Sequence, residues 1–243
     1  MIGIIDIHCH IISGVDDGAK TLEESKAMLK LAYAQGVRTI IATPHFRRGL
    51  FECPINKISD QYQALKDISR QMDERIKVFQ GCEYFAEIGM AQVSKMEPRY
   101  TMAGTTYVLA EFSRTAELSS MRAILRELIS SGYKPILAHI ERCECLHQIQ
   151  HVKELAKLGV LMQVNADSVL GEGGNRVKKF CQKLIKENLL SFIATDAHGS
   201  KVRPPNIAKC ANYLESKMGY DYAKKILIDN PQKIVDEISG EYK

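Results

Sequence analysis

Short apolar runs alternate with amphipathic segments along this 243-residue chain, and that alternation limits the folds it can adopt. The apolar runs are nearly continuous rather than interrupted by polar residues, which is typical of parallel strands covered by helices. We therefore expect strands at Gly3–His8, Arg38–Thr43, Lys77–Gly81, Thr106–Glu111, Lys134–His139, Val160–Asn165 and Leu190–Thr195.

The segments between these strands have the pattern of amphipathic helices. Thr21-Leu-Glu-Glu24 has the form of a capping box, which predicts a helix that begins there and ends near Gly36. Further helices are expected at Asn56–Arg75, Ser119–Ser131, Leu146–Leu158, Asn175–Glu187 and Pro205–Met218, followed by a helical tail to Ile238.

Seven strand–helix units predict an α/β fold whose parallel strands close into a barrel, a distorted TIM-like (β/α)7 barrel. An open, doubly wound sheet is the alternative, but no glycine-rich phosphate loop follows the first strand. The sequence contains no repeats, low-complexity tracts or long linkers, so we expect residues 1–243 to form a single domain.

Composition narrows the class of protein. Hydrophobic residues make up 45% of the chain and charged residues 26%, as in soluble globular proteins. No apolar run approaches the roughly 18 residues of a membrane span, and the first run is too short for a signal peptide, so we expect a cytoplasmic protein without membrane insertion. The seven scattered cysteines favour reduced thiols. The net charge of +4 comes from dispersed basic residues and indicates no nucleic-acid partner.

Residue types that bind metals gather at the ends of the expected strands. In a parallel barrel these ends face the same side, so side chains far apart in sequence converge on one cleft. Imidazoles and carboxylates together are good ligands for Zn, Mn or Fe. Five of the seven histidines lie at or just past a strand end: His8, His10, His45, His139 and His198. The carboxylates there are Asp6, Asp16, Asp17, Glu83, Glu111, Glu141 and Asp196.

The first strand illustrates the expected geometry. Alternate residues of a strand point to one face, so Asp6, His8 and His10 can aim at the same interior point. Each such fragment alone is also compatible with a buried hydrogen-bonded pair. Their coincidence on equivalent strand ends predicts a metal centre. The other fragments of this kind are Thr43-Pro-His45, His139-Ile-Glu141 and Asp196-Ala-His198.

Two further carboxylates, Glu83 and Glu111, follow apolar strands. A carboxylate can bridge two cations, which an imidazole cannot do. For Glu111 the alternative is an ion pair with Arg114. The available donors exceed the needs of one metal and could hold two or three cations with positions left for water. Open coordination positions are typical of catalytic rather than structural sites.

Arg142 and Arg203 lie beside the histidine-containing fragments. A guanidinium binds phosphate through two parallel hydrogen bonds, although a surface ion pair is the alternative for each arginine. Clustered cations can deprotonate a bridging water and neutralise the charge of a phosphoryl group. This combination predicts phosphoester hydrolysis by a metal-activated hydroxide. A thiolate phosphatase is disfavoured because no cysteine has an arginine six positions later.

An ordered set of motifs resembles the polymerase-and-histidinol-phosphatase (PHP) superfamily, and more narrowly the bacterial tyrosine-protein phosphatases of capsule and exopolysaccharide synthesis. The set spans nearly the whole chain, and as a set it is far more specific than His-x-His alone. The motifs are Asp6-Ile-His-Cys-His10, Val15-Asp-Asp-Gly18, Thr43-Pro-His45, Glu83, Ala110-Glu-Phe-Ser113, Ala138-His-Ile-Glu-Arg142, Thr195-Asp-Ala-His198, Arg203-Pro-Pro205 and Ile228-Asp-Asn-Pro231.

The resemblance implies the PHP fold with a centre of three metals, usually manganese, at which Fe, Co or Zn is also possible. It implies that Arg142 and Arg203 bind the phosphate and that Asp196 is a catalytic residue as well as a ligand. The implied ligands are His8, His10, Glu83 and Asp196 for one metal, Glu83, Glu111 and His139 for the second, and Asp17, His45 and His198 for the third.

The resemblance also implies a substrate and partner, the phosphotyrosine tail of a membrane-associated bacterial tyrosine kinase. A small-molecule phosphoester hydrolase of the histidinol-phosphatase type is the closest alternative. A nuclease of the same superfamily is disfavoured by the lack of a basic groove with interleaved aromatics. A non-catalytic metal-binding regulator is the alternative from another class. The sequence is silent on oligomeric state.

Overall fold

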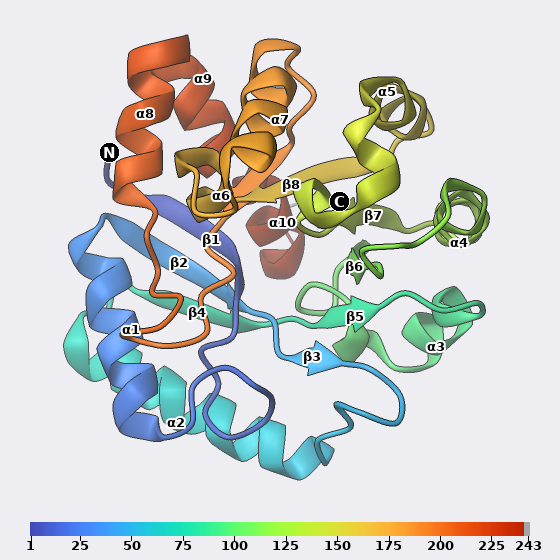
Figure 1. Ribbon diagram of the computed structural model, residues 1–243. Coiled ribbons are helices and arrows are strands. Elements are labelled where there is room, and N and C mark those ends of the chain that lie inside the picture. Colours follow the sequence, from blue (N-terminus) through green and yellow to red (C-terminus); the bar gives the residue numbers. More distant parts are fainter. Residues whose placement is uncertain (241–243) are drawn as a thin grey trace.

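A curled parallel sheet is the frame of the computed structural model, which describes residues 1–240 (Figure 1). Every pair of adjacent strands in this range is parallel. Residues 241–243, the end of the expected 1–243 domain, lie outside the described range. The strands are β1 Ile4–Cys9, β2 Val37–Ala42, β3 His45–Phe46, β4 Lys77–Gln80, β5 Glu83–Phe85, β6 Tyr107–Glu111, β7 Lys134–Leu137, β8 Leu161–Asn165 and β9 Phe192–Ala194.

The expected strands are present within a few residues of their predicted bounds, and β3 and β5 are additional to them. These two short strands follow β2 and β4 after brief interruptions. The first interruption contains Pro44, which has no amide proton to donate to a sheet. The Pro44 carbonyl still accepts a hydrogen bond from the Glu83 amide at 3.1 Å. As a result, β3 pairs with β5 and His45 lies directly opposite Glu83.

The strand order explains why sequence-distant residues meet. One sheet has the order β1-β2-β4 and the other β3-β5-β6-β7-β8-β9. A parallel bridge between Cys9 and Ala197 joins the end of β1 to the segment after β9. The sheet therefore curls into at least a half-barrel, and the carboxyl ends of its parallel strands lie along one rim.

Helices surround the curled sheet, except for α10, which lies within the ring of strands in Figure 1. The expected helix after Thr21 is confirmed, and the Thr21 hydroxyl caps it by accepting the Glu24 amide at 3.2 Å. The expected helix from Leu146 opens instead as a 3-10 turn before α5. The helices are α1 Leu22–Ala34, α2 Ile55–Met72, α3 Met90–Met96, α4 Leu118–Ser130, α5 Ile149–Lys157, α6 Ala166–Leu170, α7 Asn175–Lys186, α8 Ala208–Met218, α9 Tyr220–Lys224 and α10 Asn230–Ser239.

An apolar cluster fills the sheet interior away from the rim. Phe192 at the start of β9 and Ile136 in β7 belong to it, together with Ile234 and Val235 of α10. Because Phe192 begins its strand, α10 closes the amino-terminal end of the sheet, opposite the rim that carries the polar residues. Burial of this apolar cluster stabilises the end of the sheet that lies opposite the polar rim.

The structure bears on two expectations from the composition, reduced cysteines and the lack of a membrane span. All seven cysteines are free thiols. Within residues 1–240, no helix combines the length and the hydropathy that a membrane crossing requires.

Truncation of Ile136 should therefore destabilise the fold. Its side chain is 0% exposed, and Ile136→Ala should lower the free energy of unfolding by about 2–5 kcal/mol because it removes buried methylenes and leaves a cavity. Ile2 is 74% exposed, so Ile2→Ala should change it by less than about 0.5 kcal/mol. Urea unfolding of the two variants measures the difference, and equal effects would contradict the assigned interior.

Candidate metal centre

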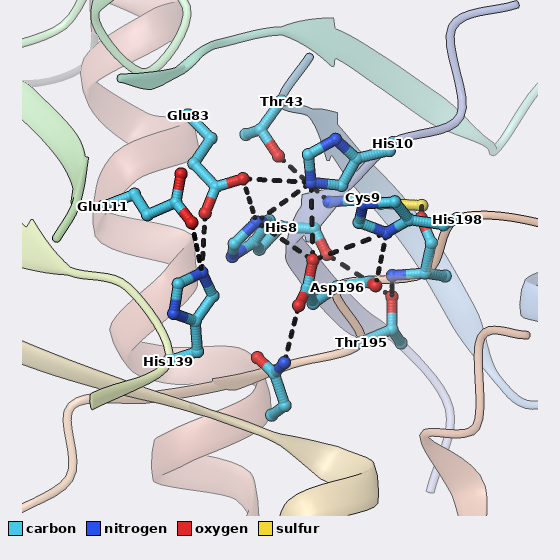
Figure 2. A network of polar contacts seen from close by, with 12 residues as sticks. His8, Cys9, His10, Thr43, Glu83, Glu111, His139, Thr195, Asp196 and His198 are labelled. Carbon is cyan, nitrogen blue, oxygen red and sulfur yellow. Dashed lines mark hydrogen bonds and ion pairs between the residues drawn. The ribbon is translucent and has the colours of Figure 1, made fainter. Parts of the chain in front are cut away.

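Nine side chains, most of them at or just past the ends of strands, converge on the rim of the sheet. Figure 2 shows Glu111 and His139 on one side of Glu83, with His10 and His198 on the other. All nine residues expected as metal ligands are brought together: the donor atoms of eight form three overlapping groups, and Nε2 of the ninth, His139, lies 2.8 Å from Oε1 of Glu83. These groups are His8, His10, Glu83 and Asp196; His10, Asp17, His45 and His198; and His45, Glu83 and Glu111, each with donor atoms within 4.8 Å of one another.

Glu83 lies at the middle of the centre and is fully buried. Its Oε2 atom lies 3.2 Å from Nε2 of His8, 3.2 Å from Nε2 of His10 and 3.0 Å from Nδ1 of His45. Its Oε1 atom lies 2.8 Å from Nε2 of His139. The pairing of β3 with β5 places this carboxylate among the imidazoles. One side chain thus reaches all the inner donor groups.

Asp196 connects the histidines to the arginines. Its Oδ1 atom lies 3.4 Å from Nε2 of both His8 and His10. Its Oδ2 atom lies 2.8 Å from Nη2 of Arg142 and 2.7 Å from Nη2 of Arg203. The two carboxylate oxygens therefore face different groups, one toward the donor cluster and one toward the two guanidiniums.

The outer part of the centre is more open to solvent. The Asp17 side chain is 50% exposed, and its Oδ1 atom lies 3.5 Å from Nε2 of His45 and 3.5 Å from Nε2 of His198. The hydrogen bond with His198 holds the pKa of Asp17 below its ordinary value. This carboxylate lies where solvent and a substrate can reach the centre.

Glu111 faces the same cluster. Its carboxylate oxygens lie 3.7 Å from Nδ1 of His45 and 3.8 Å from Nε2 of His139. No ion pair joins it to Arg114 within residues 1–240, so the structural alternative considered from sequence is not observed. Burial, followed by the nearby Glu83 charge, raises the pKa of Glu111, so a cation between these two carboxylates would favour its ionised form.

The donor atoms themselves indicate that the residues fit bound cations. Nδ1 of His8 lies 3.2 Å from Oε1 of Gln163, and Nδ1 of His10 lies 2.8 Å from Oδ2 of Asp16. With Nδ1 donating in each ring, both Nε2 atoms carry lone pairs, and these two atoms face each other at 3.2 Å. The buried Oε2 of Glu83 beside them has no hydrogen-bond partner in the described chain. Divalent cations would relieve all three electron-rich atoms.

The charges of the buried carboxylates also indicate a site for cations. Burial alone would raise the pKa values of Glu83 and Asp196, but the surrounding imidazoles, and Arg142 beside Asp196, hold both pKa values well below their ordinary ranges. Burial alone would lower the pKa of His10, but Asp16, Asp196 and Glu83 raise it well above its ordinary value, so these carboxylates favour positive charge at this ring, either a proton or a cation that takes its place at Nε2. The buried carboxylates thus stay ionised and attract positive charge, as a cation site requires.

The two arginines line open hollows beside the cluster. A hollow of about 780 Å³ and another of about 610 Å³ both have Arg142 and Arg203 in their walls. Both guanidiniums are oriented by the same oxygen atom of Asp196. Neither arginine side chain is fully buried, so each can be reached from the hollows. Their remaining N–H groups are available to a tetrahedral anion at the edge of the cluster.

Three residues of the centre have a left-handed backbone conformation, which is rare for residues other than glycine. His139 has φ of 30°, Asp196 has φ of 51° and Arg203 has φ of 52°. Such conformations cost on the order of 1–3 kcal/mol each and persist where surrounding contacts impose them. Strain at these three positions indicates that their placement is specified by the site rather than by local preference.

Three supporting residues of the centre were not assigned a role from the sequence. The Gln163 side-chain oxygen accepts the His139 amide at 2.8 Å, and its amide group donates to Asn165 at 2.9 Å. Asn165 in turn donates to Oδ2 of Asp196 at 2.7 Å. Asp16, noted from sequence without a role, orients His10 as described above. The signal for the β8 pair was the polar alternation Gln163-Val-Asn165 at the end of an apolar strand.

Asp6 behaves differently from the strand-alternation prediction. Instead of aiming with His8 and His10, its carboxylate accepts the Thr195 amide at 3.0 Å and the Thr195 hydroxyl at 2.6 Å. The strand β1 is irregular in its pairing with β2 on either side of Asp6, which explains the departure from simple alternation. Asp6 therefore links β1 to the segment that carries Asp196.

Comparisons with known proteins agree with this geometry. The structure closely resembles crystal structures of YwqE from Bacillus subtilis and CpsB from Streptococcus pneumoniae, described as unique metal-dependent tyrosine phosphatases. The TM-score is 0.89 with 28% identity, and the match covers 96% of this chain and 95% of the other. A phosphotriesterase homology protein from Escherichia coli shares the fold at a TM-score of 0.64 and 12% identity, over 95% of this chain and 98% of the other.

Sequence comparison identifies the family. The tyrosine-protein phosphatase CpsB of Streptococcus agalactiae serotype V is 34% identical over 238 residues, which cover 96% of this chain and 98% of that protein. The tyrosine-protein phosphatase YwqE of Bacillus subtilis is 30% identical over 217 residues, which cover 89% and 85%. The family model for capsular polysaccharide synthesis proteins CpsB/CapC matches residues 4–236. This chain therefore belongs to the CpsB/CapC family of capsular polysaccharide synthesis.

Proposed function

We propose that this chain is a metal-dependent protein-tyrosine phosphatase of capsule or exopolysaccharide synthesis. Its substrate is the phosphotyrosine tail of a membrane-associated bacterial tyrosine kinase, reached from the cytoplasm, where free thiols persist. The tyrosine-phosphatase names of the relatives support this substrate over histidinol phosphate. The observation that carries the proposal is Asp196, whose two oxygens contact the histidine cluster on one side and the guanidiniums of Arg142 and Arg203 on the other.

The finer description of the fold is part of the same proposal. If β2 with β3, and β4 with β5, are each counted as one interrupted strand, the sheet has seven strand positions in the described chain. That count supports a distorted (β/α)7 barrel of the PHP type. The whole chain, residues 1–243, would then form one metallophosphatase domain.

The centre is proposed to hold three divalent cations, with manganese preferred among Mn, Fe, Co and Zn because carboxylates share the ligand sets. When bound, the cations supply Lewis acidity and bring the pKa of a coordinated water toward neutrality. The proposed ligand sets are His8, His10, Glu83 and Asp196; Glu83, Glu111 and His139; and Asp17, His45 and His198.

Arg142 and Arg203 are proposed to bind the phosphoryl oxygens that the cluster does not hold. Both guanidiniums are oriented by Asp196 before a substrate arrives, so little reorganisation is needed when charge develops on the phosphoryl group. Asn165 holds the same Asp196 oxygen and keeps the carboxylate in one orientation. In this proposal, Arg142 and Arg203 bind the phosphoryl group and stabilise its charge, and neither acts as the nucleophile.

The supporting residues keep the imidazoles in the form that binds metals. Gln163 and Asp16 accept the Nδ1 protons of His8 and His10, so each Nε2 atom, directed at the cluster, is the one that would coordinate a cation. A phenol has a pKa of about 10, so a phenolate departs without a strong proton donor more readily than an alkoxide does. A tyrosine ester thus suits a centre built mainly from electron-pair donors.

Removal of metals should abolish activity. The purified protein should release phosphate from a phosphotyrosine peptide, lose that activity after dialysis against a chelator, and regain it with added Mn²⁺, because the proposed nucleophilic water depends on the cations. A malachite-green assay measures the released phosphate, and metal analysis measures the bound metal. Turnover that survives complete chelation, or a preference for histidinol phosphate over the peptide, would reject the proposal. Alkylation of the two partly buried thiols, Cys53 and Cys145, serves as a control and should leave turnover unchanged.

Loss of either arginine should impair catalysis without emptying the centre. Arg142→Ala or Arg203→Ala should lower kcat/KM for the phosphotyrosine peptide roughly 100- to 1000-fold, because each removes a preoriented donor to the phosphoryl group. The bound manganese content should stay near the wild-type value. Arg122→Ala is the matched control, since Arg122 pairs with Glu154 on α4 and α5 at 2.8 Å. Near-normal kcat/KM in both site variants would contradict their assigned role.

A further inference from the structure

The smaller hollow beside the arginines has an aromatic side that the proposed reaction does not use. This hollow of about 610 Å³ extends outward from Glu111 and His139, with Arg142 and Arg203 in its wall. Arg47 and Phe85, with others, line it too, although neither residue has a part in binding cations or phosphate. A phosphate bound near the arginines would have its ester group within reach of this hollow.

Strand geometry explains why these two residues lie there. Phe85 is two residues beyond Glu83 on β5, so its side chain points to the same face one step nearer the rim. In the parallel pairing, Phe85 lies opposite Glu111 of β6. Arg47 is likewise two residues beyond His45. The pair therefore lies one layer outward from Glu83 and His45, and Phe85 is level with Glu111.

Arg47 and Phe85 form a defined stack. The Arg47 guanidinium carbon lies 4.1 Å from the centroid of the Phe85 ring. Two backbone hydrogen bonds between Arg47 and Phe51, of 3.0 Å and 2.8 Å, hold the arginine at the base of a tight turn. The guanidinium of Arg47 makes no ion pair or hydrogen bond with residues 1–240, in contrast to Arg48, whose Nε lies 2.9 Å from Glu87. Its donors and its outer face are therefore available.

We propose that the Arg47–Phe85 stack is a subsite for the aromatic ring of the substrate. The proposal rests on the proposed phosphatase function and names the feature that makes the site prefer aryl phosphates. Ring stacking on a guanidinium and contact with a phenylalanine both favour an aromatic group. An alkyl phosphate, such as phosphoserine in a peptide, has no ring to occupy this wall.

The experiment compares two non-hydrolysable anions, phenylphosphonate and methylphosphonate, so leaving-group chemistry plays no part. Titration calorimetry of the manganese-loaded protein gives their affinities, and the wild type should bind phenylphosphonate more tightly. Phe85→Leu and Arg47→Ala should each reduce this preference about fivefold, equivalent to about 1 kcal/mol, with methylphosphonate affinity nearly unchanged. Arg48→Ala is the matched control and should keep the full preference.

Several outcomes would overturn the subsite. These are a wild type without preference for the phenyl group, variants that keep the preference, or an equal loss of both ligands in Arg47→Ala, which would make Arg47 a general anion binder. Thermal unfolding of each variant verifies that the fold is intact. The phosphatase proposal is tested separately by turnover of the phosphotyrosine peptide. A protein that prefers phenylphosphonate but releases no phosphate would keep the subsite and reject the function.

Discussion

The burial of several ionised carboxylates at one rim is the constraint on which the rest of the structure depends. Glu83 and Asp196 are almost fully buried, and an isolated buried carboxylate is too costly to remain charged. Five imidazoles and two guanidiniums around them compensate part of that cost. The remaining unsatisfied lone pairs fit divalent cations. The buried negative charge that costs folding free energy is therefore also the feature that suits the centre to cations.

The fold meets this constraint by separating its two ends. Parallel strands bring residues that are up to about 190 positions apart to one rim, as in the contact of Asp6 with Thr195. At the other end, α10 packs against a largely apolar cluster that supports the sheet interior. At the rim, the strained residues His139 and Asp196 are held by hydrogen bonds with Gln163 and Asn165 of β8.

Much of this arrangement is predictable from the sequence because it depends on residue type and strand periodicity. Apolar runs identify the strands, and histidines at their ends identify the rim. The supporting contacts are harder to predict, since Gln163 meets His8 across 155 positions and no local pattern specifies that distance. Asp6 leaves the expected face because irregular pairing breaks the alternation of β1. The interruption at Pro44, which allows His45 to face Glu83, likewise depends on the neighbouring strand.

Anomalous X-ray diffraction from crystals grown with Mn²⁺ and soaked in orthophosphate tests the central claim most directly. The account predicts manganese peaks enclosed by the imidazoles around Glu83, with a phosphate that contacts both those ions and the guanidiniums of Arg142 and Arg203. Absence of manganese from this cluster, or a phosphate bound away from the two arginines, would contradict it.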